Sequence, residues 1–119
     1  METNQSEAAL QQSCRIWFWN NYPQLRGLLF MVNNNSSNKF TGKIAKELGV
    51  IAGVSDLLFI FGGTVHCIEM KTLTGYQSPE QNTWQKKVEE QGVRYYIVKT
   101  KPEFEHLIKK IIYEHTKSL

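Results

Sequence analysis

Cysteine is scarce in this chain, and its placement excludes most cysteine chemistry. The 119 residues include two cysteines, Cys14 and Cys67, which stand far apart and lack both a CxxC partner and a histidine at zinc-ligand spacing. A structural zinc site is therefore not expected. One disulfide between them stays open, but two reduced, buried thiols in a reducing cytoplasm are the favoured interpretation.

Long apolar runs and a strong charge excess are also missing. No stretch reaches the roughly 18 consecutive apolar residues of a membrane-spanning helix. The first 13 residues are polar and lack the basic start and apolar centre of a signal peptide. The chain carries 14 Lys and Arg against 11 Asp and Glu, a net charge of +3. This excess permits a nucleic-acid partner but excludes the mass phosphate neutralisation of histone-like proteins.

What is present is the composition of one folded domain. The mass of 13.8 kDa suits a single domain over residues 1–119, and 41% of the residues are hydrophobic. Capping residues and periodicity predict helices, and short apolar runs predict strands. In chain order we expect a helix between Ser6 and Pro23, a strand over 28–32, a short helix over 41–48, strands over 57–61 and 64–71, a helix between Ser78 and Gly92, a strand over 93–98 and an amphipathic C-terminal helix through 104–112.

The order of these elements predicts an α/β fold with a mixed sheet. Strands 64–71 and 93–98 flank a helix, and the right-handed crossover of such a βαβ unit makes its strands parallel. Strands 57–61 and 64–71 flank Gly62 and Gly63, which suit the tight turn of an antiparallel hairpin. The expected architecture is a sheet flanked by helices, in the order α-β-(short α)-β-β-α-β-α.

The hairpin turn also predicts a register that brings charges together. If Phe61 opposes Thr64, then Asp56 opposes Glu69, with Cβ atoms about 4.5–5.5 Å apart. Alternation along the strand places Lys71 on the same face as Glu69. Facing carboxylates repel, and a divalent cation is the simplest compensation. The alternative is a solvated strand end, where Glu69 and Lys71 form a surface pair worth under about 1 kcal/mol.

Glu7 and Gln81 are further candidates for this site, and each has an ordinary structural alternative. Glu7 stands three residues before Leu10 on the apolar face of the first helix, where a buried carboxylate needs a partner. As an acid in the first turn, Glu7 also simply favours the helix dipole. Gln81 shares a helix face with Trp84, but it also completes a capping box with Ser78.

The motifs of the chain resemble those of a nuclease family. They are, in chain order, GVSDL at 53–57, IEMK at 68–71, GYQSPEQ at 75–81, and Gly92 followed by YYIV at 95–98. With 12 residues between Asp56 and Glu69, this set is similar to the VRR-NUC group of the PD-(D/E)XK nucleases over nearly the whole chain. The resemblance implies a restriction-endonuclease-like fold and a small stand-alone protein of the phage or bacterial type, acting in the cytoplasm.

The resemblance also implies a metal-dependent phosphodiesterase. The positions that match the family's ligands for Mg²⁺ or Mn²⁺ are Asp56, Glu69, Met70 through its backbone carbonyl, and Glu7. Lys71 would position or activate the attacking water, and Gln81 would tune orientation near the active site. One departure is Asn33-Asn34-Asn35, where many relatives carry an element like Asn-Glu-Gly.

We therefore expect a structure-selective DNA endonuclease that acts as a homodimer on branched DNA such as Holliday junctions. No base-reading motif is present, so recognition of shape is favoured over recognition of sequence. The candidate phosphate contacts are Lys39, Lys43, Lys46 and Lys86, each of which is otherwise an ordinary solvated lysine. Trp17, Trp19, Phe40 and the C-terminal helix are candidates for a dimer face, and the favoured alternative for most of them is a place in the core. The alternative function is a non-catalytic DNA-binding or scaffolding module that keeps the nuclease fold.

Overall fold

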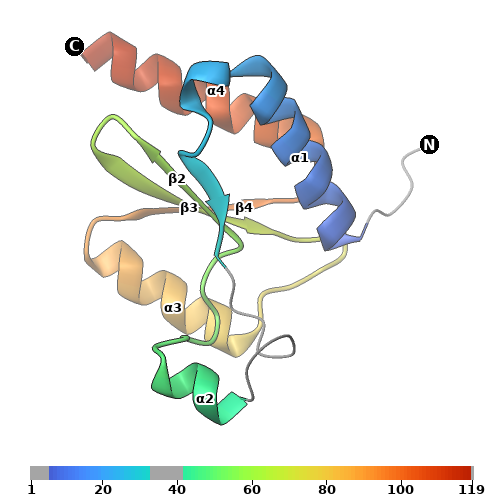
Figure 1. Ribbon diagram of the computed structural model, residues 1–119, viewed down its shortest axis with the longest axis vertical. Helices are drawn as coiled ribbons and strands as arrows, with labels where there is room; N and C mark the ends of the chain where they lie inside the picture. Colours follow the sequence, from blue (N-terminus) through green and yellow to red (C-terminus); the bar gives the residue numbers. More distant parts are fainter. Residues whose placement is uncertain (1–5, 33–41, 119) are drawn as a thin grey trace.

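The computed structural model describes residues 6–32 and 42–118, and it confirms the predicted order of helices and strands. The elements, labelled in Figure 1, are α1 (Glu7–Asn21), the 3-10 helix η1 (Pro23–Leu25), β1 (Leu29–Met31), α2 (Gly42–Glu47), β2 (Leu57–Phe61), β3 (Thr64–Met70), α3 (Pro79–Glu90), β4 (Arg94–Val98) and α4 (Lys101–Ser118). The short η1 is an addition to that order, and it begins at the proline that ends the first helix. The candidate residues Lys39, Phe40 and Asn33-Asn34-Asn35 lie outside the described residues.

The strands form one mixed sheet in the order β1-β2-β3-β4. The first two pairings are antiparallel, and β3 pairs with β4 in parallel, as predicted. Phe61 pairs with Thr64 across the Gly62-Gly63 turn, so the predicted hairpin register is confirmed. Both turn glycines have positive φ angles, 61° and 74°, as a two-residue hairpin turn requires. β3 is consequently an inner strand with a neighbour on each side.

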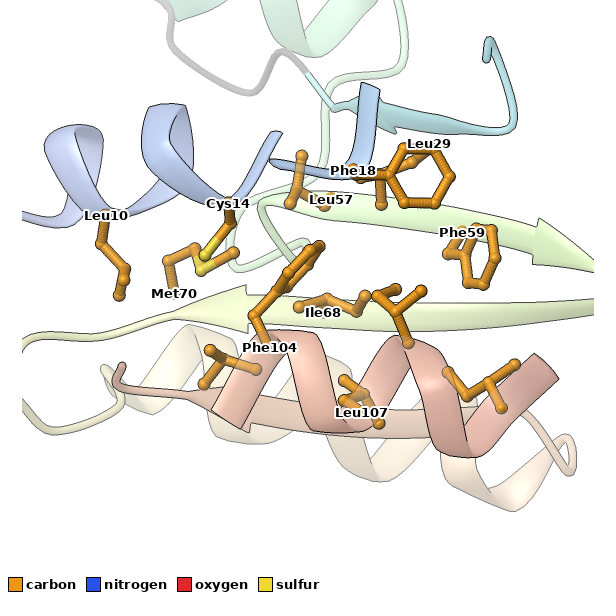
Figure 2. Close-up of a cluster of buried hydrophobic side chains, with 13 residues drawn as sticks. Leu10, Cys14, Phe18, Leu29, Leu57, Phe59, Ile68, Met70, Phe104 and Leu107 are labelled. Carbon is orange, nitrogen blue, oxygen red and sulfur yellow. The ribbon is translucent and has the colours of Figure 1, made fainter. Parts of the chain in front are cut away.

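The main hydrophobic core lies between the sheet and the helices α1 and α4, which cover one face of the sheet (Figure 1). Figure 2 shows side chains that meet there from α1, the strands and α4. Phe18, Phe59 and Phe104 are each 2% exposed or less. Phe18 and Phe59 meet edge to face, with ring centroids 5.5 Å apart. Burial of each such ring contributes about 2–3 kcal/mol, so this layer anchors β3.

α3 covers the opposite face of the sheet (Figure 1) and packs less deeply. Trp84 and Val88 are half-buried, and no residue of α3 is fully buried. Trp84 meets Tyr95 of β4 edge to face at 6.0 Å between centroids. β3 is nevertheless buried on both faces from His66 onward. The layer between β3 and α3 contains polar side chains, among them Glu69 of β3 and Gln85 of α3, which both bond to Gln77.

Cys14 on α1 and Cys67 on β3 are both free and buried, which confirms the predicted pair of reduced thiols. Burial raises the pKa of the Cys14 thiol to about 12, and it also raises the pKa of Cys67. Both side chains thus remain protonated and pack as small apolar groups. None of the helices among residues 6–32 and 42–118 combines the length and the hydropathy that a membrane crossing needs.

Gly53, in the loop that enters β2, approaches the first turn of α3. Its φ of 86° lies in the left-handed region that favours glycine. A Cβ atom at this position would overlap the backbone carbonyl of Glu80 and lie 2.7 Å from the amide nitrogen of Gln81. The start of β2 and the start of α3 are therefore packed backbone against backbone.

We predict that Gly53→Ala lowers the free energy of unfolding by more than about 2 kcal/mol, since it combines a left-handed φ with overlap against α3. Gly92→Ala is the matched control, because Gly92 has a similar φ of 83° and open space where the Cβ would stand. The control should cost only about 1 kcal/mol. Urea denaturation measures both, and equal losses would show that the close approach is unimportant.

Candidate metal and phosphodiester site

The charged residues predicted from the hairpin gather at the carboxyl end of β3. Glu69 is fully buried there at 0% exposure, and Lys71, just beyond the strand, is 7% exposed. The Lys71 Nζ atom lies 3.6 Å from Oε2 of Glu69. The alternative of a solvated surface pair is therefore wrong, because both groups are shielded from water by the sheet and by α3. A buried pair of this kind is sensitive to the removal of either partner.

The two carboxylate oxygens of Glu69 have different surroundings. Oε1 accepts hydrogen bonds from the hydroxyl of Tyr95 on β4 and from Nε2 of Gln77 at 3.0 Å. Oε2 is buried and has no hydrogen-bond partner among the described residues. The carboxylate is thus held by one oxygen, while its other oxygen lies 3.6 Å from the Nζ atom of Lys71.

The donors to Oε1 are themselves held in place. Nε2 of Gln77 also donates to Oε1 of Gln85 at 2.7 Å, and the side-chain oxygen of Gln77 accepts from Nδ2 of Asn82 at 3.2 Å. Both partners belong to α3. Burial, followed by the hydrogen bond to Glu69 and its negative charge, raises the pKa of Tyr95 far above its usual range. Tyr95 therefore stays protonated as a donor, and Glu69 has little freedom to rotate.

Asp56 is placed by two backbone contacts at the start of β2. Its carbonyl accepts from the amide of Val32 at 2.9 Å, and its Oδ2 accepts from the amide of Met70 at 2.6 Å. The β2–β3 ladder ends at Leu57 and Ile68, so Asp56 bonds through its side chain to β3 and forms no strand pair with Glu69. The sequence prediction of a facing pair is corrected in this detail.

The surroundings of Asp56 disfavour its negative charge. Burial raises the pKa of this carboxyl, and the charges of Glu7 and Glu69 raise it further, against the lowering effects of the Met70 amide and of Lys71. A raised pKa in an acid means that folding favours the protonated form, a contribution that is lost as the pH rises through the folded-state pKa. The charged form of Asp56 is thus less favourable in the folded chain than in water, and a bound cation would favour it.

The donors available at this site fit a hard divalent cation. In a strand the amide and carbonyl of one residue point to the same side, so the geometry of β3 puts the Met70 carbonyl on the side of the amide that donates to Asp56. Oε2 of Glu69, the carboxylate of Asp56 and this carbonyl are all oxygen donors. No three His, Cys, Asp or Glu side chains within residues 6–32 and 42–118 form a metal-binding group by themselves. Two carboxylates with water and substrate oxygens match the coordination that Mg²⁺ prefers.

Glu7 lies in the first turn of α1 and is exposed, so it is not the buried carboxylate that its place on the apolar side of the helix could have made it. A residue in the first turn projects past the end of the packed helix face, where the sheet no longer covers it. Glu7 nevertheless lines the same hollow as Asp56, and its charge acts on the pKa of Asp56. It stands at the edge of the site, where the helix dipole also favours an acid.

Gln81 takes the structural role that its capping box predicts. Its side-chain oxygen accepts from the amide of Ser78 at 2.8 Å, and the Ser78 hydroxyl accepts from the amide of Gln81 at 3.1 Å. The amide side chain that contacts Glu69 is Gln77, four residues earlier. The contribution of Gln81 to the site is thus indirect. Gln81 caps the start of α3, and Asn82 and Gln85 of that helix bond to Gln77.

The candidate lysines among residues 42–118 are exposed. Lys43 and Lys46 belong to α2, and Lys86 belongs to α3. Of the candidates for a dimer face, Trp17 is half-buried and packs on Tyr22 and the core, whereas Trp19 is 43% exposed. Trp17 is thus part of the packed structure, and Trp19 lies on the surface.

We predict that Tyr95→Phe lowers the free energy of unfolding by about 2 kcal/mol, because it removes a donor to a buried carboxylate and keeps the ring. Tyr96→Phe is the control, since the hydroxyl of Tyr96 makes only a long contact of 3.4 Å with Nδ1 of His66. That variant should lose less than about 1 kcal/mol. Chemical denaturation measures the free energy of unfolding of both variants. A larger loss in Tyr96→Phe than in Tyr95→Phe would contradict the role given to Tyr95.

Of the comparisons with known proteins, the one with solved structures supports the fold. Neither models of protein families nor curated protein sequences give a match to this chain. Among solved structures, the chain is similar to a "VRR_NUC domain protein", with a TM-score of 0.75 and 18% sequence identity, over 92% of this chain and 89% of that one. The chain therefore has the fold of that VRR_NUC domain protein, which confirms the mixed α/β fold predicted for it.

Proposed function

Given its VRR_NUC fold, we propose that this chain is a nuclease that hydrolyses phosphodiester bonds in DNA with Mg²⁺ or Mn²⁺. The observation that carries the proposal is the asymmetric environment of Glu69: Oε1 is held by Tyr95 and Gln77, while the buried Oε2 lacks a hydrogen bond beside Lys71. A buried carboxylate oxygen in this state is unfavourable by itself. It is explained if a cation occupies the space before it.

The residues around that space suit a hydrolytic reaction. Oε2 of Glu69, the Asp56 carboxylate and the Met70 carbonyl would hold the cation, and Glu7 lines the same hollow as Asp56. The chemistry that a bound Mg²⁺ supplies is Lewis acidity, which stabilises charge on phosphate oxygens and makes water a better nucleophile. The Lys71 ammonium has three donors, with which it would orient the attacking water and offset charge developing on the phosphate.

The proposed substrate is branched DNA, bound by a homodimer. One domain of this size offers little surface beside its catalytic groups, and a second copy supplies a symmetric partner for a substrate with paired strands. The absence of a base-reading motif from the sequence favours recognition of shape, as at a Holliday junction. The exposed Lys43, Lys46 and Lys86 are available for phosphate contacts.

We predict that the purified chain cuts labelled junction, flap or duplex DNA with Mg²⁺ and loses this activity in EDTA. Lys71→Ala should lower the cleavage rate by at least about a hundredfold, as expected for the loss of a charge at the reacting phosphate. Lys117→Ala, at an exposed position of α4, is the matched control and should cut like the wild type.

Cutting in EDTA, or an unaffected Lys71→Ala variant, would rule out this mechanism. Binding of every DNA substrate without cutting under any metal condition would instead favour the non-catalytic module.

We also predict that Mg²⁺ or Mn²⁺ raises the Tm without DNA. Ligand at about 100 times its Kd stabilises the folded state by about 2.7 kcal/mol. Glu69→Gln keeps an oxygen that accepts from Tyr95 but removes the negative charge, so its Tm should not respond to either cation. Glu90→Gln, at an exposed position of α3, should respond like the wild type. A thermal shift that survives in Glu69→Gln would place the cation elsewhere.

A further inference from the structure

A hollow of about 540 Å³ opens between α1 and β1, directly beside Asp56. One end of this α1–β1 groove carries the acids Glu7 and Asp56, and Arg15 lines it further along α1. The opposite wall includes Phe30 and Met31 of the edge strand β1, which are 40% and 60% exposed. The groove thus begins at the proposed catalytic site and leads away from it between a polar helix and an apolar strand.

The polar wall of the groove continues as a stripe along α1. Glu7, Gln11, Arg15 and Trp19 follow one another at intervals of four residues, so each lies beside the next and the row turns gradually around the helix. The stripe from Glu7 to Trp19 spans about 18 Å, since each residue rises about 1.5 Å. That distance matches about five stacked nucleotides of a DNA strand, at about 3.4 Å each.

The far end of the stripe holds two arginines on one aromatic ring. The guanidinium carbons of Arg15 and Arg26 lie 5.4 Å and 4.7 Å from the centroid of the Trp19 ring. Nε of Arg26 also donates to the backbone carbonyl of Trp19 at 3.0 Å. Cation–π contacts of this kind contribute about 0.5–1 kcal/mol each at exposed sites, and they hold both side chains in place in the absence of a ligand.

Neither arginine has its charge neutralised by the protein. Within the described ranges, no carboxylate lies within 4.0 Å of the guanidinium of Arg15 or Arg26, although both are exposed. Arg94, in contrast, is paired with Glu114 at 3.7 Å. Arg15 lines the groove that leads from the proposed catalytic site, and Arg26 contacts the same Trp19 ring as Arg15. Two pre-positioned guanidiniums without an acidic partner are suited to phosphate groups.

We propose that the α1–β1 groove binds the DNA strand on one side of the cleaved bond, with Arg15 and Arg26 on its phosphates and Trp19 as their support. This inference rests on the proposed nuclease function for its choice of ligand. The apolar side chains of Phe30 and Met31 give the sugars and bases a surface to pack on. The site is separate from the lysines of α2 and α3, and Trp19 serves here as a positioning residue for two charges.

The test is DNA binding in EDTA, where the proposed metal-dependent cleavage is absent. Fluorescence anisotropy with an end-labelled single strand of about 20 nucleotides gives the Kd at several NaCl concentrations, and each phosphate contact contributes about 0.7 to the slope of log K against log salt. Arg15→Ala and Arg26→Ala should each weaken binding by about tenfold and reduce that slope by about 0.7. Arg94→Ala is the control and should leave both quantities unchanged.

Variants of Trp19 test whether the positions of the two arginines matter for DNA binding in addition to their charge. Trp19→Ala should weaken binding although it removes no charge, and Trp19→Phe should restore most of the affinity because it keeps an aromatic face. The inference would be overturned if Arg15→Ala and Arg26→Ala kept the wild-type Kd, or if they lost no more affinity than Arg94→Ala. It would also be overturned if the wild-type chain did not bind the strand. Arginine-dependent binding by a chain that never cuts DNA would support the groove while refuting the proposed catalysis. Cutting with unaffected arginine variants would refute the groove alone.

Discussion

The arrangement of this molecule depends on one constraint: the carboxylate of Glu69 is fully buried and must be satisfied. Tyr95 and Gln77 satisfy one of its oxygens, and Lys71 stands beside the other at 3.6 Å. Burying a charge is expensive unless it is paired and hydrogen-bonded. The fold supplies these partners from β4, from the loop before α3 and from the residue that follows β3, so three separate segments converge on a single side chain.

The architecture explains how such convergence is possible. β3 is an inner strand of the sheet, and the hydrophobic layer under α1 and α4 anchors one of its faces. The other face lies under α3, whose shallow packing leaves space for a polar network. Gly53 brings the start of β2 against the start of α3, which fixes Asp56 near β3. The apolar layer thus provides rigidity, and the polar layer provides chemistry.

The parts of the site that follow from local sequence rules could be predicted, and the others could not. The two-glycine turn fixes the antiparallel register, which can be found by counting residues from the turn. That register alone is enough to bring Asp56, Glu69 and Lys71 to one end of the hairpin. A parallel pairing has no such turn, so the sequence did not indicate that Tyr95 would reach Glu69. Gln77 lies in a loop, where alternation gives no direction. Gln81 forms the capping box that the sequence predicts instead of contacting Glu69. Glu7 is exposed because it lies in the first turn of its helix.

The central claim is that Oε2 of Glu69 is held ready for a divalent cation. A crystal structure with Mn²⁺, located by anomalous scattering, tests it most directly. The account predicts one Mn²⁺ about 2.0–2.3 Å from Oε2, in contact with Asp56 and the Met70 carbonyl, while Oε1 keeps its bonds to Tyr95 and Gln77. Mn²⁺ bound away from Glu69, or bound through Oε1 with the Tyr95 hydrogen bond broken, would contradict it.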